Sequence, residues 1–290
     1  DSCSSDCKSF FEVGEDGTSS YRGIALDVEN IQYKSEYRDI EGERFIFTIF
    51  RFDLGSDTQP RFDHFSVIAE KGMTELDALL NIQERQDPSL VFRYSCRGAI
   101  CGSCGMVING KPNLACRTQL SGLGSREVLI EPLPNFEIVK DLIVNMKPFW
   151  KAYRLIEPWL QPAAREAKGE HLVTEKNRAQ IDQFVGCILC ACCHGACPVV
   201  SLNEKYVGPA ALAKLFRFIR DSRDRRDRRQ AFKRLDDKDG LWACHTVFRC
   251  TEDCPKQVRP TDGIEGLRRR AIAAKCCGSE KKKIFKENET

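Results

Sequence analysis

The arrangement of apolar and polar residues predicts β-strands in the first half of the chain. The runs RFIFTIFRFDL and FDHFSVIA, which begin at Arg44 and Phe62, are rich in Phe and Ile, as strands are. Further strands are predicted around VFRYS and at EVLIEPL. Asn109-Gly110, between MVI and KPNLAC, is the strongest short signal for a β-hairpin.

One helix is predicted between these strands, directly after Thr74. The Thr74 hydroxyl is suited to cap its first turn, and Leu76, Leu79 and Leu80 then share one face. The resulting order of strand, strand, helix, strand and strand predicts a small α+β unit that ends near Pro134.

Beyond that unit the pattern becomes helical. Residues 141–160, DLIVNMKPFWKAYRLIEPWL, have a helical pattern. Two more helices are predicted in PAALAKLFRFIRDSR and PTDGIEGLRRRAIAAK, where Pro209 and Pro260 suit the first helical position. FIRDSRDRRDRRQAFKR mixes acids with a basic excess, and we interpret it as a solvated helix face rather than a patch for anionic headgroups or partner subunits.

These patterns divide the chain into four segments. Residues 1–42 are polar and without a hydrophobic period, and we interpret them as an N-terminal extension. Residues 43–140 and 141–276 are the two predicted domains, and residues 277–290 are a basic tail. Because the chain starts with Asp rather than Met, we expect a processed or incomplete N-terminus.

Composition and net charge exclude only a few classes of function. The 290 residues are 42% hydrophobic, and the formal net charge of +3 favours no nucleic-acid partner. No window approaches the run of about 18 apolar residues that a membrane helix needs. If the protein works at a membrane, another chain is expected to hold it there.

The cysteines change this picture. Sixteen of them are present, and most fall in spacings of two, three or four intervening residues. In a chain of this length such short loops indicate metal ligation in a reducing compartment rather than a disulfide scaffold.

The first group of cysteines has the spacing of a plant-type 2Fe-2S site, C-x4-C-x2-C followed by one more. Its members are Cys96, Cys101, Cys104 and Cys116. Gly98, Gly102 and Gly105 carry no side chain, so we expect them to let backbone N–H groups approach the cluster sulfurs. The alternative is a zinc knuckle or inert buried thiols, but zinc sites prefer paired C-x2-C spacing.

The second group reads C-x2-C-x2-C-x3-C-P, the bacterial ferredoxin run whose fourth cysteine serves the other cluster of a two-cluster protein. The partner half, Cys244, Cys250 and Cys254, lies downstream. By this crossing rule one 4Fe-4S cluster is predicted. Its ligands are Cys187, Cys190, Cys193 and Cys254.

The cysteines that remain for the other cluster number three, one fewer than a 4Fe-4S cluster takes. The spacing of the first half places a ligand at position 247 of the second, and this residue is Val247. We therefore predict a 3Fe-4S cluster, with ligands Cys197, Cys244 and Cys250. The alternative, a 4Fe-4S cluster with water on the open iron, is disfavoured because an apolar Val247 excludes an exchangeable ligand. Cys192 lies between two ligands, and we interpret it as a small buried hydrophobic residue.

Three clusters in one chain predict one-electron transfer along a row. The sequence has no Gly-rich phosphate loop, serine nucleophile elbow or paired-carboxylate motif. Substrate chemistry is therefore expected on another subunit, or on a cofactor held by that other subunit.

These residues resemble the iron-sulfur subunit of succinate dehydrogenase and fumarate reductase, respiratory complex II. The resemblance lies in SCRGAICGSCG, NGKPNLAC, KDLIV, CILCACC, GPAAL, DSRD and CPKQVRPTDGI, which occur in family order. It implies an α+β chain, with an N-terminal β-grasp 2Fe-2S ferredoxin-like domain followed by an all-α two-cluster ferredoxin-like domain. It also implies an FAD-containing flavoprotein partner that oxidises succinate to fumarate, and membrane anchor subunits that help form a quinone site. Electrons then pass from FAD through 2Fe-2S, 4Fe-4S and 3Fe-4S clusters to quinone.

The resemblance also identifies residues near quinone. Family members place a histidine where His245 stands, and its imidazole is expected to donate a hydrogen bond to a quinone oxygen or to relay a proton. Pro198, Leu202 and Val247 are the other residues expected there. Family dehydrogenases carry a Trp pair soon after the cysteine-proline, whereas CPVVSLNEKY has none and is closer to the fumarate reductase branch. Cys244-His245 instead resembles the dehydrogenase branch, so the direction of turnover stays open.

Several alternatives stay open at this point. The complex can run as a quinol:fumarate reductase, or the chain can serve another flavin dehydrogenase. From a different class, a zinc-stabilised interaction module would use the same cysteines structurally. The expected location is peripheral, on the matrix side of the mitochondrial inner membrane, with the cytoplasmic face of a bacterial inner membrane as the alternative.

Overall fold

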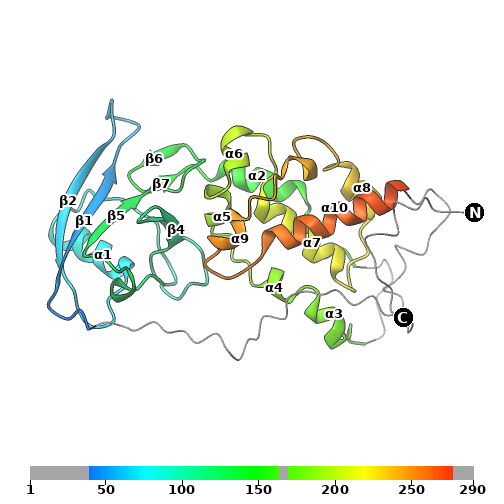
Figure 1. Ribbon diagram of the computed structural model, residues 1–290, viewed down its shortest axis with the longest axis horizontal. Coiled ribbons are helices and arrows are strands. Elements are labelled where there is room, and N and C mark those ends of the chain that lie inside the picture. Colours follow the sequence, from blue (N-terminus) through cyan, green and yellow to red (C-terminus); the bar gives the residue numbers. More distant parts are fainter. Residues whose placement is uncertain (1–38, 163–168, 277–290) are drawn as a thin grey trace, which may run out of the picture. The chain divides into compact units, whose positions relative to one another are not determined.

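A computed structural model describes residues 39–162 and 169–276 of the chain (Figure 1). Residues Tyr37–Ile272 form one compact unit, whose fold is given below. The other unit, Asp1–Glu36 with Ala273–Thr290, lies almost wholly outside the described residues. Most of the predicted N-terminal extension and the whole basic tail are therefore outside them as well.

The first half folds around a five-stranded mixed sheet of order β2-β1-β5-β3-β4 (Figure 1). Its strands are β1 (Arg44–Arg51), β2 (Arg61–Ile68), β3 (Gly105–Ile108), β4 (Lys111–Leu114) and β5 (Glu127–Glu131). β1 pairs antiparallel with β2 and parallel with β5, and β3 pairs antiparallel with β4 and β5. The strands predicted at RFIFTIFRFDL, FDHFSVIA, the hairpin and EVLIEPL are confirmed.

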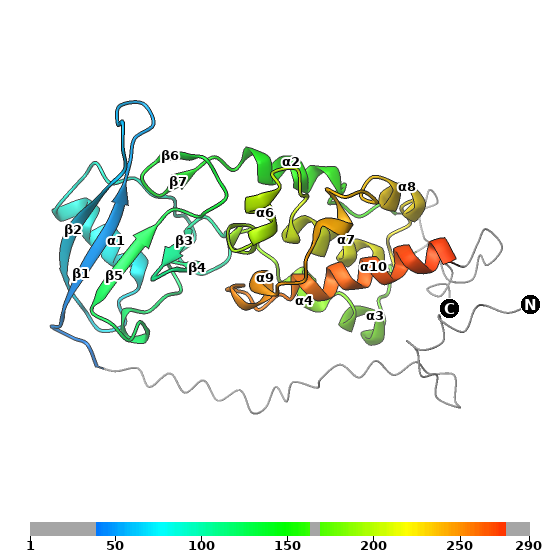
Figure 2. The ribbon, with the colours of Figure 1, turned by 45° about the horizontal axis from the view of Figure 1, so that its top comes forward.

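Helix α1 (Glu75–Arg85) covers one face of this sheet (Figure 2). Leu76 and Leu79 on α1 share a core with the inward-facing Phe47 of β1. The predicted cap is confirmed, because the Thr74 hydroxyl accepts a hydrogen bond from the backbone N–H of the third helical residue, whose carboxylate accepts one from the Thr74 N–H. The helix therefore begins where its sequence predicts.

The hairpin between β3 and β4 also follows the sequence. Asn109 and Gly110 have φ values of 48° and 76°. Both central residues of a type I′ turn need positive φ, which Asn and Gly adopt at low cost. This turn brings β4, and the cysteine that follows it, back beside β3.

The segment VFRYS, residues 91–95, is not a strand, contrary to the prediction. Its first N–H, that of Val91, donates to the Asp141 carboxylate at 3.0 Å, and the Val91 carbonyl accepts from the N–H of Leu142 at 3.2 Å. These bonds satisfy backbone groups that a sheet ladder would otherwise satisfy. The chain can therefore leave the sheet and lead directly to Cys96.

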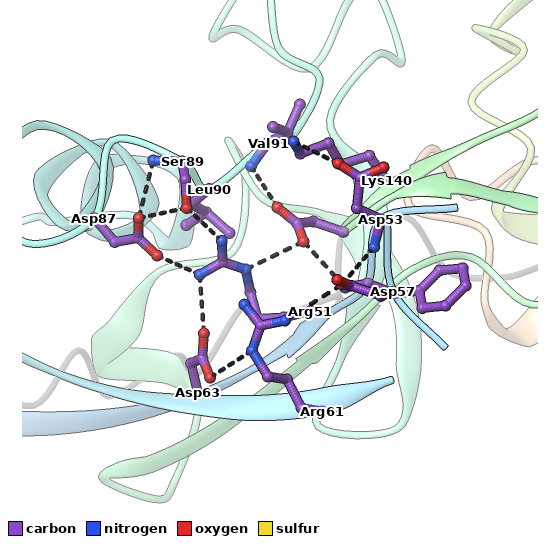
Figure 3. Close-up of polar contacts among 12 residues, drawn as sticks. Arg51, Asp53, Asp57, Arg61, Asp63, Asp87, Ser89, Leu90, Val91 and Lys140 are labelled. Carbon is purple, nitrogen blue, oxygen red and sulfur yellow. Dashed lines mark hydrogen bonds and ion pairs between the residues drawn. The ribbon is translucent and has the colours of Figure 1, made fainter. Parts of the chain in front are cut away.

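Buried Arg51 is the centre of an ionic network (Figure 3), to which the buried Asp141 also belongs. Arg51 Nε lies 3.1 Å from Asp141 Oδ1, and its Nη1 lies 3.1 Å from Asp63 Oδ2 and also contacts Asp87. Its Nη2 donates to Ser89 at 2.8 Å. One guanidinium thus holds together two strands, the segment before VFRYS and the turn at Asp141, and a buried charge without these partners would be costly.

The second half is helical, after a short two-stranded ribbon of β6 (Ile138–Lys140) and β7 (Ile143–Val144). The helices are α2 (Lys147–Leu155), α3 (Glu175–Ala179), α4 (Asp182–Val185), α5 (Cys192–Gly195), α6 (Pro198–Leu202), α7 (Pro209–Arg220), α8 (Arg228–Lys233), α9 (Arg249–Glu252) and α10 (Pro260–Cys276). α7 and α10 begin at the predicted prolines. Of the predicted helical stretch 141–160 only the part in α2 is helix, because the ribbon occupies its start.

The stretch FIRDSRDRRDRRQAFKR is not a solvated helix face, contrary to the prediction. Asp221, Asp224 and Arg226 lie between α7 and α8 and are buried. Arg226 pairs with Asp224 at 2.8 Å and donates to the backbone carbonyls of Ile156 at 3.0 Å and Trp159 at 2.8 Å. The Arg226 guanidinium is buried because it donates to the carbonyls at and just after the end of α2, and Asp224 is buried as its ion-pair partner. Asp221 pairs instead with Arg217 and Arg223.

Among the described residues, no helix has both the length and the apolar character needed to cross a membrane.

Glu75, the first residue of α1, is a buried acid. It is 0% exposed, and neither carboxylate oxygen has a hydrogen-bond partner among the described residues. Burial raises the pKa of this carboxyl to about 8. The folded protein therefore holds a proton that the unfolded chain releases near its ordinary pKa of 4.5.

Stability of the region around α1 should consequently fall as pH rises from about 5 towards 8, since only the unfolded state gains from ionisation in this window. Glu75→Gln should remove that pH dependence and slow hydrogen exchange of α1 at pH 8. Glu84→Gln, which changes an exposed acid on the same helix, is the control. Equal pH profiles for wild type and Glu75→Gln would contradict this account.

Candidate iron-sulfur sites

The loop from Cys96 to Cys104 directs backbone N–H groups at its own sulfurs. Cys96 Sγ accepts from the N–H groups of Cys101 at 3.3 Å, Ile100 at 3.3 Å and Gly98 at 3.4 Å. These bonds, that of Cys101 first, lower the pKa of Cys96 to about 6. The loop is therefore arranged to hold a thiolate, the form that binds metal.

The other cysteines of this group lie beside the same loop. The Ala99 N–H donates to Cys116 Sγ at 3.3 Å. Burial raises the pKa of Cys104 to about 12, and the thiols of Cys116 and Cys101 add to the shift. The structure thus brings the first four predicted ligands together, and the hairpin turn accounts for the return of Cys116.

Two glycines of this loop allow it to approach the second cysteine run. A Cβ on Gly102, whose φ is 73°, would lie 2.9 Å from the Cα of Cys190, and one on Gly105 would lie 2.9 Å from the Cys190 carbonyl oxygen. Gly98 has only an ordinary contact, 3.7 Å from the Cys96 carbonyl. The crowding at Gly102 and Gly105 therefore comes from the second cysteine run, whereas the sequence led us to expect it from the sulfurs of the first site.

The segments that begin at Cys187 and Cys244 have the same backbone conformation. The second and fourth residues after Cys187 have φ values of 58° and 65°, and those after Cys244 have 56° and 65°. In each segment the left-handed fourth residue, Ala191 or Phe248, precedes a short helix directly. A left-handed backbone costs free energy in residues other than glycine. Its repetition at equivalent positions indicates that the two loops present their cysteines in the same way.

Val247 takes the position of Cys190 in this repeat. Each stands third after the first cysteine of its loop, between the two left-handed residues. Cys193 and Cys250 also correspond, since each is the second residue of its short helix. The alignment predicted from spacing is therefore also an alignment of backbone geometry.

Cysteines of one loop lie close enough to cysteines of the other to raise their pKa values. Burial raises the pKa of Cys254 to about 11, and the thiols of Cys190 and Cys187 contribute. Burial likewise raises the pKa of Cys250, with contributions from Cys197 and Cys244. The neighbours are thus those of the crossed grouping.

Two residues that the sequence did not single out contact the three-cysteine group. The Thr261 hydroxyl lies 3.3 Å from Cys250 Sγ. Tyr206 is buried, and its pKa is raised by burial first, and further by the nearby cysteines, including a hydrogen bond with Cys244. Neither position carries a motif, so only the tertiary contacts reveal them.

Three of the four residues predicted near quinone meet at one pocket. Pro198, His245 and Val247 line it, together with the cysteines of the third group. Leu202 is 84% exposed and does not line this pocket. Val247 is 50% exposed, so this chain alone does not provide the exclusion of water that its apolar side chain led us to expect.

Cys192 is buried, as predicted, but it is more than a packing residue. Its thiol hydrogen-bonds the Cys190 sulfur, which is the first cause of the lowered pKa of Cys190. Cys192 is thus a donor beside a predicted ligand.

Arg268 on α10 holds the loop that carries Cys244. Its guanidinium donates to the backbone carbonyls of Leu241 at 3.3 Å and of Cys244, and to the Thr246 hydroxyl at 3.2 Å. It also pairs with Glu265 at 2.9 Å. One side chain therefore joins both ends of the loop to α10.

The donor chemistry of these sites fits iron-sulfur clusters. Among the described residues, no group of three or more His, Cys, Asp or Glu side chains has the geometry for a single bound metal ion. In a 4Fe-4S or 3Fe-4S cluster each cysteine binds a different iron, and in a 2Fe-2S cluster two cysteines bind each iron, so no cluster gathers all its cysteines around a single ion. The N–H groups directed at Cys96 and the crossed neighbours of Cys254 are what such clusters require.

Comparison with known proteins agrees with this geometry. The family model of a 2Fe-2S iron-sulfur cluster binding domain matches residues 46–151, and that of a 4Fe-4S dicluster domain matches residues 183–258. These matches define the class of protein: an electron-transfer protein that binds 2Fe-2S and 4Fe-4S clusters.

Whole-chain relatives narrow the class. The mitochondrial succinate dehydrogenase [ubiquinone] iron-sulfur subunit 1 of Oryza sativa subsp. japonica is 41% identical over 233 residues, which are 79% of this chain and 82% of the relative. The chain belongs to the family of succinate dehydrogenase iron-sulfur subunits.

Solved structures show the same fold. A chain of the Mycobacterium smegmatis Sdh1 complex in the apo form is 27% identical, with a TM-score of 0.72 over 82% of this chain and 98% of that one. A hypothetical protein from Helicobacter pylori, 16% identical with a TM-score of 0.50, shares the fold over 84% of this chain and 41% of that one.

Arg268→Met should release the loop of residues 241–248. Hydrogen bonds from a charged donor contribute about 1.5–3 kcal/mol each, so loss of several should speed amide exchange in this loop by at least about tenfold. Arg259→Met, which removes an exposed pair with Asp262, is the matched control. Unchanged exchange in Arg268→Met would show that the loop is held by other contacts.

Proposed function

We propose that the chain is the electron-transfer subunit of a succinate:quinone oxidoreductase. In this proposal it receives electrons from the FAD of a flavoprotein subunit and delivers them to quinone at the membrane. The observation that carries the proposal is the repeated backbone of the loops at Cys187 and Cys244, with Val247 at the one position where a ligand is missing. Substrate chemistry belongs to the partner subunit.

The proposed ligands form three sets. The 2Fe-2S cluster is held by Cys96, Cys101, Cys104 and Cys116, the 4Fe-4S cluster by Cys187, Cys190, Cys193 and Cys254, and the 3Fe-4S cluster by Cys197, Cys244 and Cys250. When bound, the clusters supply one-electron oxidation and reduction. A zinc-stabilised module is the competing assignment, and iron and acid-labile sulfide analysis of the purified chain separates the two.

We propose that hydrogen-bond donors of this chain, together with burial, set the reduction potential of each cluster. The N–H groups at Cys96, the Cys192 thiol at Cys190 and the Thr261 hydroxyl at Cys250 all lie near sulfur as donors. Donors to cluster sulfur stabilise the more negative, reduced form and raise its potential. Burial of the later cysteines acts in the opposite sense, since a low dielectric disfavours added charge.

The third cluster is proposed to be 3Fe-4S because Val247 offers no donor atom where Cys190 offers sulfur. The left-handed residues that flank both Val247 and Cys190 support this, because the two positions share the same local backbone. The alternative is a 4Fe-4S cluster with water on its open iron, and the half-exposed side chain of Val247 is compatible with it. The two differ in their magnetic properties when oxidised.

Quinone is proposed to bind beside the pocket that Pro198, His245 and Val247 line. The His245 imidazole is exposed and lines this pocket, and it is suited to donate to a quinone oxygen or relay a proton. Leu202 is proposed to meet the membrane anchor subunits rather than quinone itself, because it is highly exposed and outside the pocket.

The flavoprotein is proposed to dock on the first cysteine loop. Ile100, inside that loop, is 68% exposed, and Tyr94 just before it is also exposed. An apolar side chain at this position suits a protein interface. Together with the anchor subunits this arrangement makes the chain a peripheral subunit, which we propose lies on the matrix side of the mitochondrial inner membrane, the alternative being the cytoplasmic side of a bacterial one.

The physiological direction is a separate question. CPVVSLNEKY resembles the fumarate reductase branch in lacking the Trp pair, which favours quinol:fumarate reductase as the second candidate function. Rates of succinate-dependent quinone reduction and quinol-dependent fumarate reduction, measured on one preparation, distinguish the two. A complex inactive with both substrates would indicate a different flavin dehydrogenase.

Val247→Cys should complete the third ligand set and convert the cluster to 4Fe-4S. The expected result is loss of the oxidised 3Fe-4S signal in electron paramagnetic resonance, with one more iron per chain. Val185→Cys adds a thiol at a similarly exposed position on α4 and should leave the signal unchanged. A wild-type complex without the oxidised signal would contradict the 3Fe-4S assignment.

His245→Ala should lower the rate of quinone reduction while the three clusters remain. The reason is loss of the proposed donor, which is expected to cost about tenfold or more. Succinate oxidation with an artificial acceptor should stay at the wild-type rate, since it does not need quinone. His64→Ala, an exposed histidine on β2, is the control, and equal quinone rates for both variants would remove His245 from the site.

A further inference from the structure

Asn135, in the segment between β5 and β6, reaches the turn that connects Cys193 to Cys197. Its side-chain Nδ2 lies 3.0 Å from the carbonyl oxygen of His194, 2.9 Å from that of Gly195 and 3.0 Å from that of Cys197. One amide group with two hydrogens thus serves three carbonyls of one short turn.

Two of these carbonyls also accept backbone bonds, that of His194 from the N–H of Cys197 at 3.2 Å and that of Cys197 from the N–H of Ser201 at 3.4 Å. The third belongs to Gly195, the last residue of α5, at the helix end where carbonyls have no partner inside the helix. Asn135 thus adds one donor from outside that joins all three carbonyls. Its own φ of 67° lies in the left-handed region, which Asn tolerates better than most residues.

The neighbours of Asn135 contact the same turn. A Cβ on Gly195 would lie 3.3 Å from the Pro134 carbonyl oxygen, so the segment runs directly over this glycine. The Phe136 ring stacks on the His194 ring with centroids 4.9 Å apart. The turn is therefore held by three consecutive residues, of which only Asn135 bonds its backbone carbonyls through a side chain.

We propose that Asn135 is a positioning residue that sets the separation of Cys193 and Cys197. This inference rests on the proposed function, in which these two cysteines bind different clusters. The turn between them is a short covalent connection from one ligand set to the other. By fixing the shape of this turn, Asn135 keeps the 4Fe-4S and 3Fe-4S sites at a constant separation. It also ties both sites to the segment between β5 and β6, in the last part of the 2Fe-2S domain.

Two substitutions test the contribution of the Asn135 side-chain amide apart from that of the neighbouring residues. Asn135→Asp keeps the size and places carboxylate oxygens, which accept and do not donate, against the three carbonyls. Asn135→Gly keeps the backbone conformation and only removes the amide. Asn145→Asp is the matched control, because its amide donates to Glu137 at 2.9 Å on the β6–β7 ribbon.

The test is electron paramagnetic resonance with redox titration of the purified complex. In Asn135→Asp the spectra and midpoint potentials of the 4Fe-4S and 3Fe-4S clusters should both shift, while the 2Fe-2S signal, which serves as an internal reference, should match wild type. Asn135→Gly should shift both in the same way but less, and Asn145→Asp should shift neither.

Wild-type spectra and potentials in both Asn135 variants would overturn the inference. So would a change confined to one of the two clusters, or equal loss of all three signals in Asn135→Gly, which would indicate a general folding role. If wild type itself lacked the 4Fe-4S and 3Fe-4S signals, the proposed function would fail instead. The two failures are therefore distinguishable.

Discussion

The structure depends on bringing sulfur atoms from distant segments together. Cys254 lies among the cysteines that begin at Cys187, and Cys197 lies among those that begin at Cys244. In the proposed ligand sets neither loop is complete alone, so each half of the helical region needs the other to bind its cluster. The helices are short where the cysteines are dense, because the chain must turn every few residues to direct a side chain inwards. The longer helices α7 and α10 provide the apolar core around them.

The same constraint explains where the backbone is unusual. Non-glycine residues with positive φ are uncommon, yet they recur at equivalent places in both loops and in the loop after Cys96. In the loop after Cys96 they direct backbone N–H groups at one sulfur. From outside, Arg268 binds carbonyls of the loop that contains the left-handed Thr246, and Asn135 binds carbonyls of the turn that follows the left-handed Ala191.

Much of the fold was predictable because its signals are local. The Thr74 cap, the Asn109-Gly110 turn and the helices at Pro209 and Pro260 each depend on a few neighbouring residues. The errors share a cause. VFRYS has the composition of a strand, but a carboxylate some 50 residues away takes its N–H. The acids and arginines between α7 and α8 look exposed in sequence, but the open end of α2 draws them inside.

The sequence by itself determined the class of the sites, since the cysteine spacing is visible directly and Val247 stands where the spacing of the other loop has a cysteine. Only the tertiary structure revealed what surrounds them: Tyr206 and Thr261 beside the third group, Cys192 bonded to Cys190, and Leu202 apart from the pocket. The physical reason is distance along the sequence. The spacing of the cysteines is a local property of the chain, whereas the hydrogen bonds and burial of a sulfur depend on distant residues that meet only after folding.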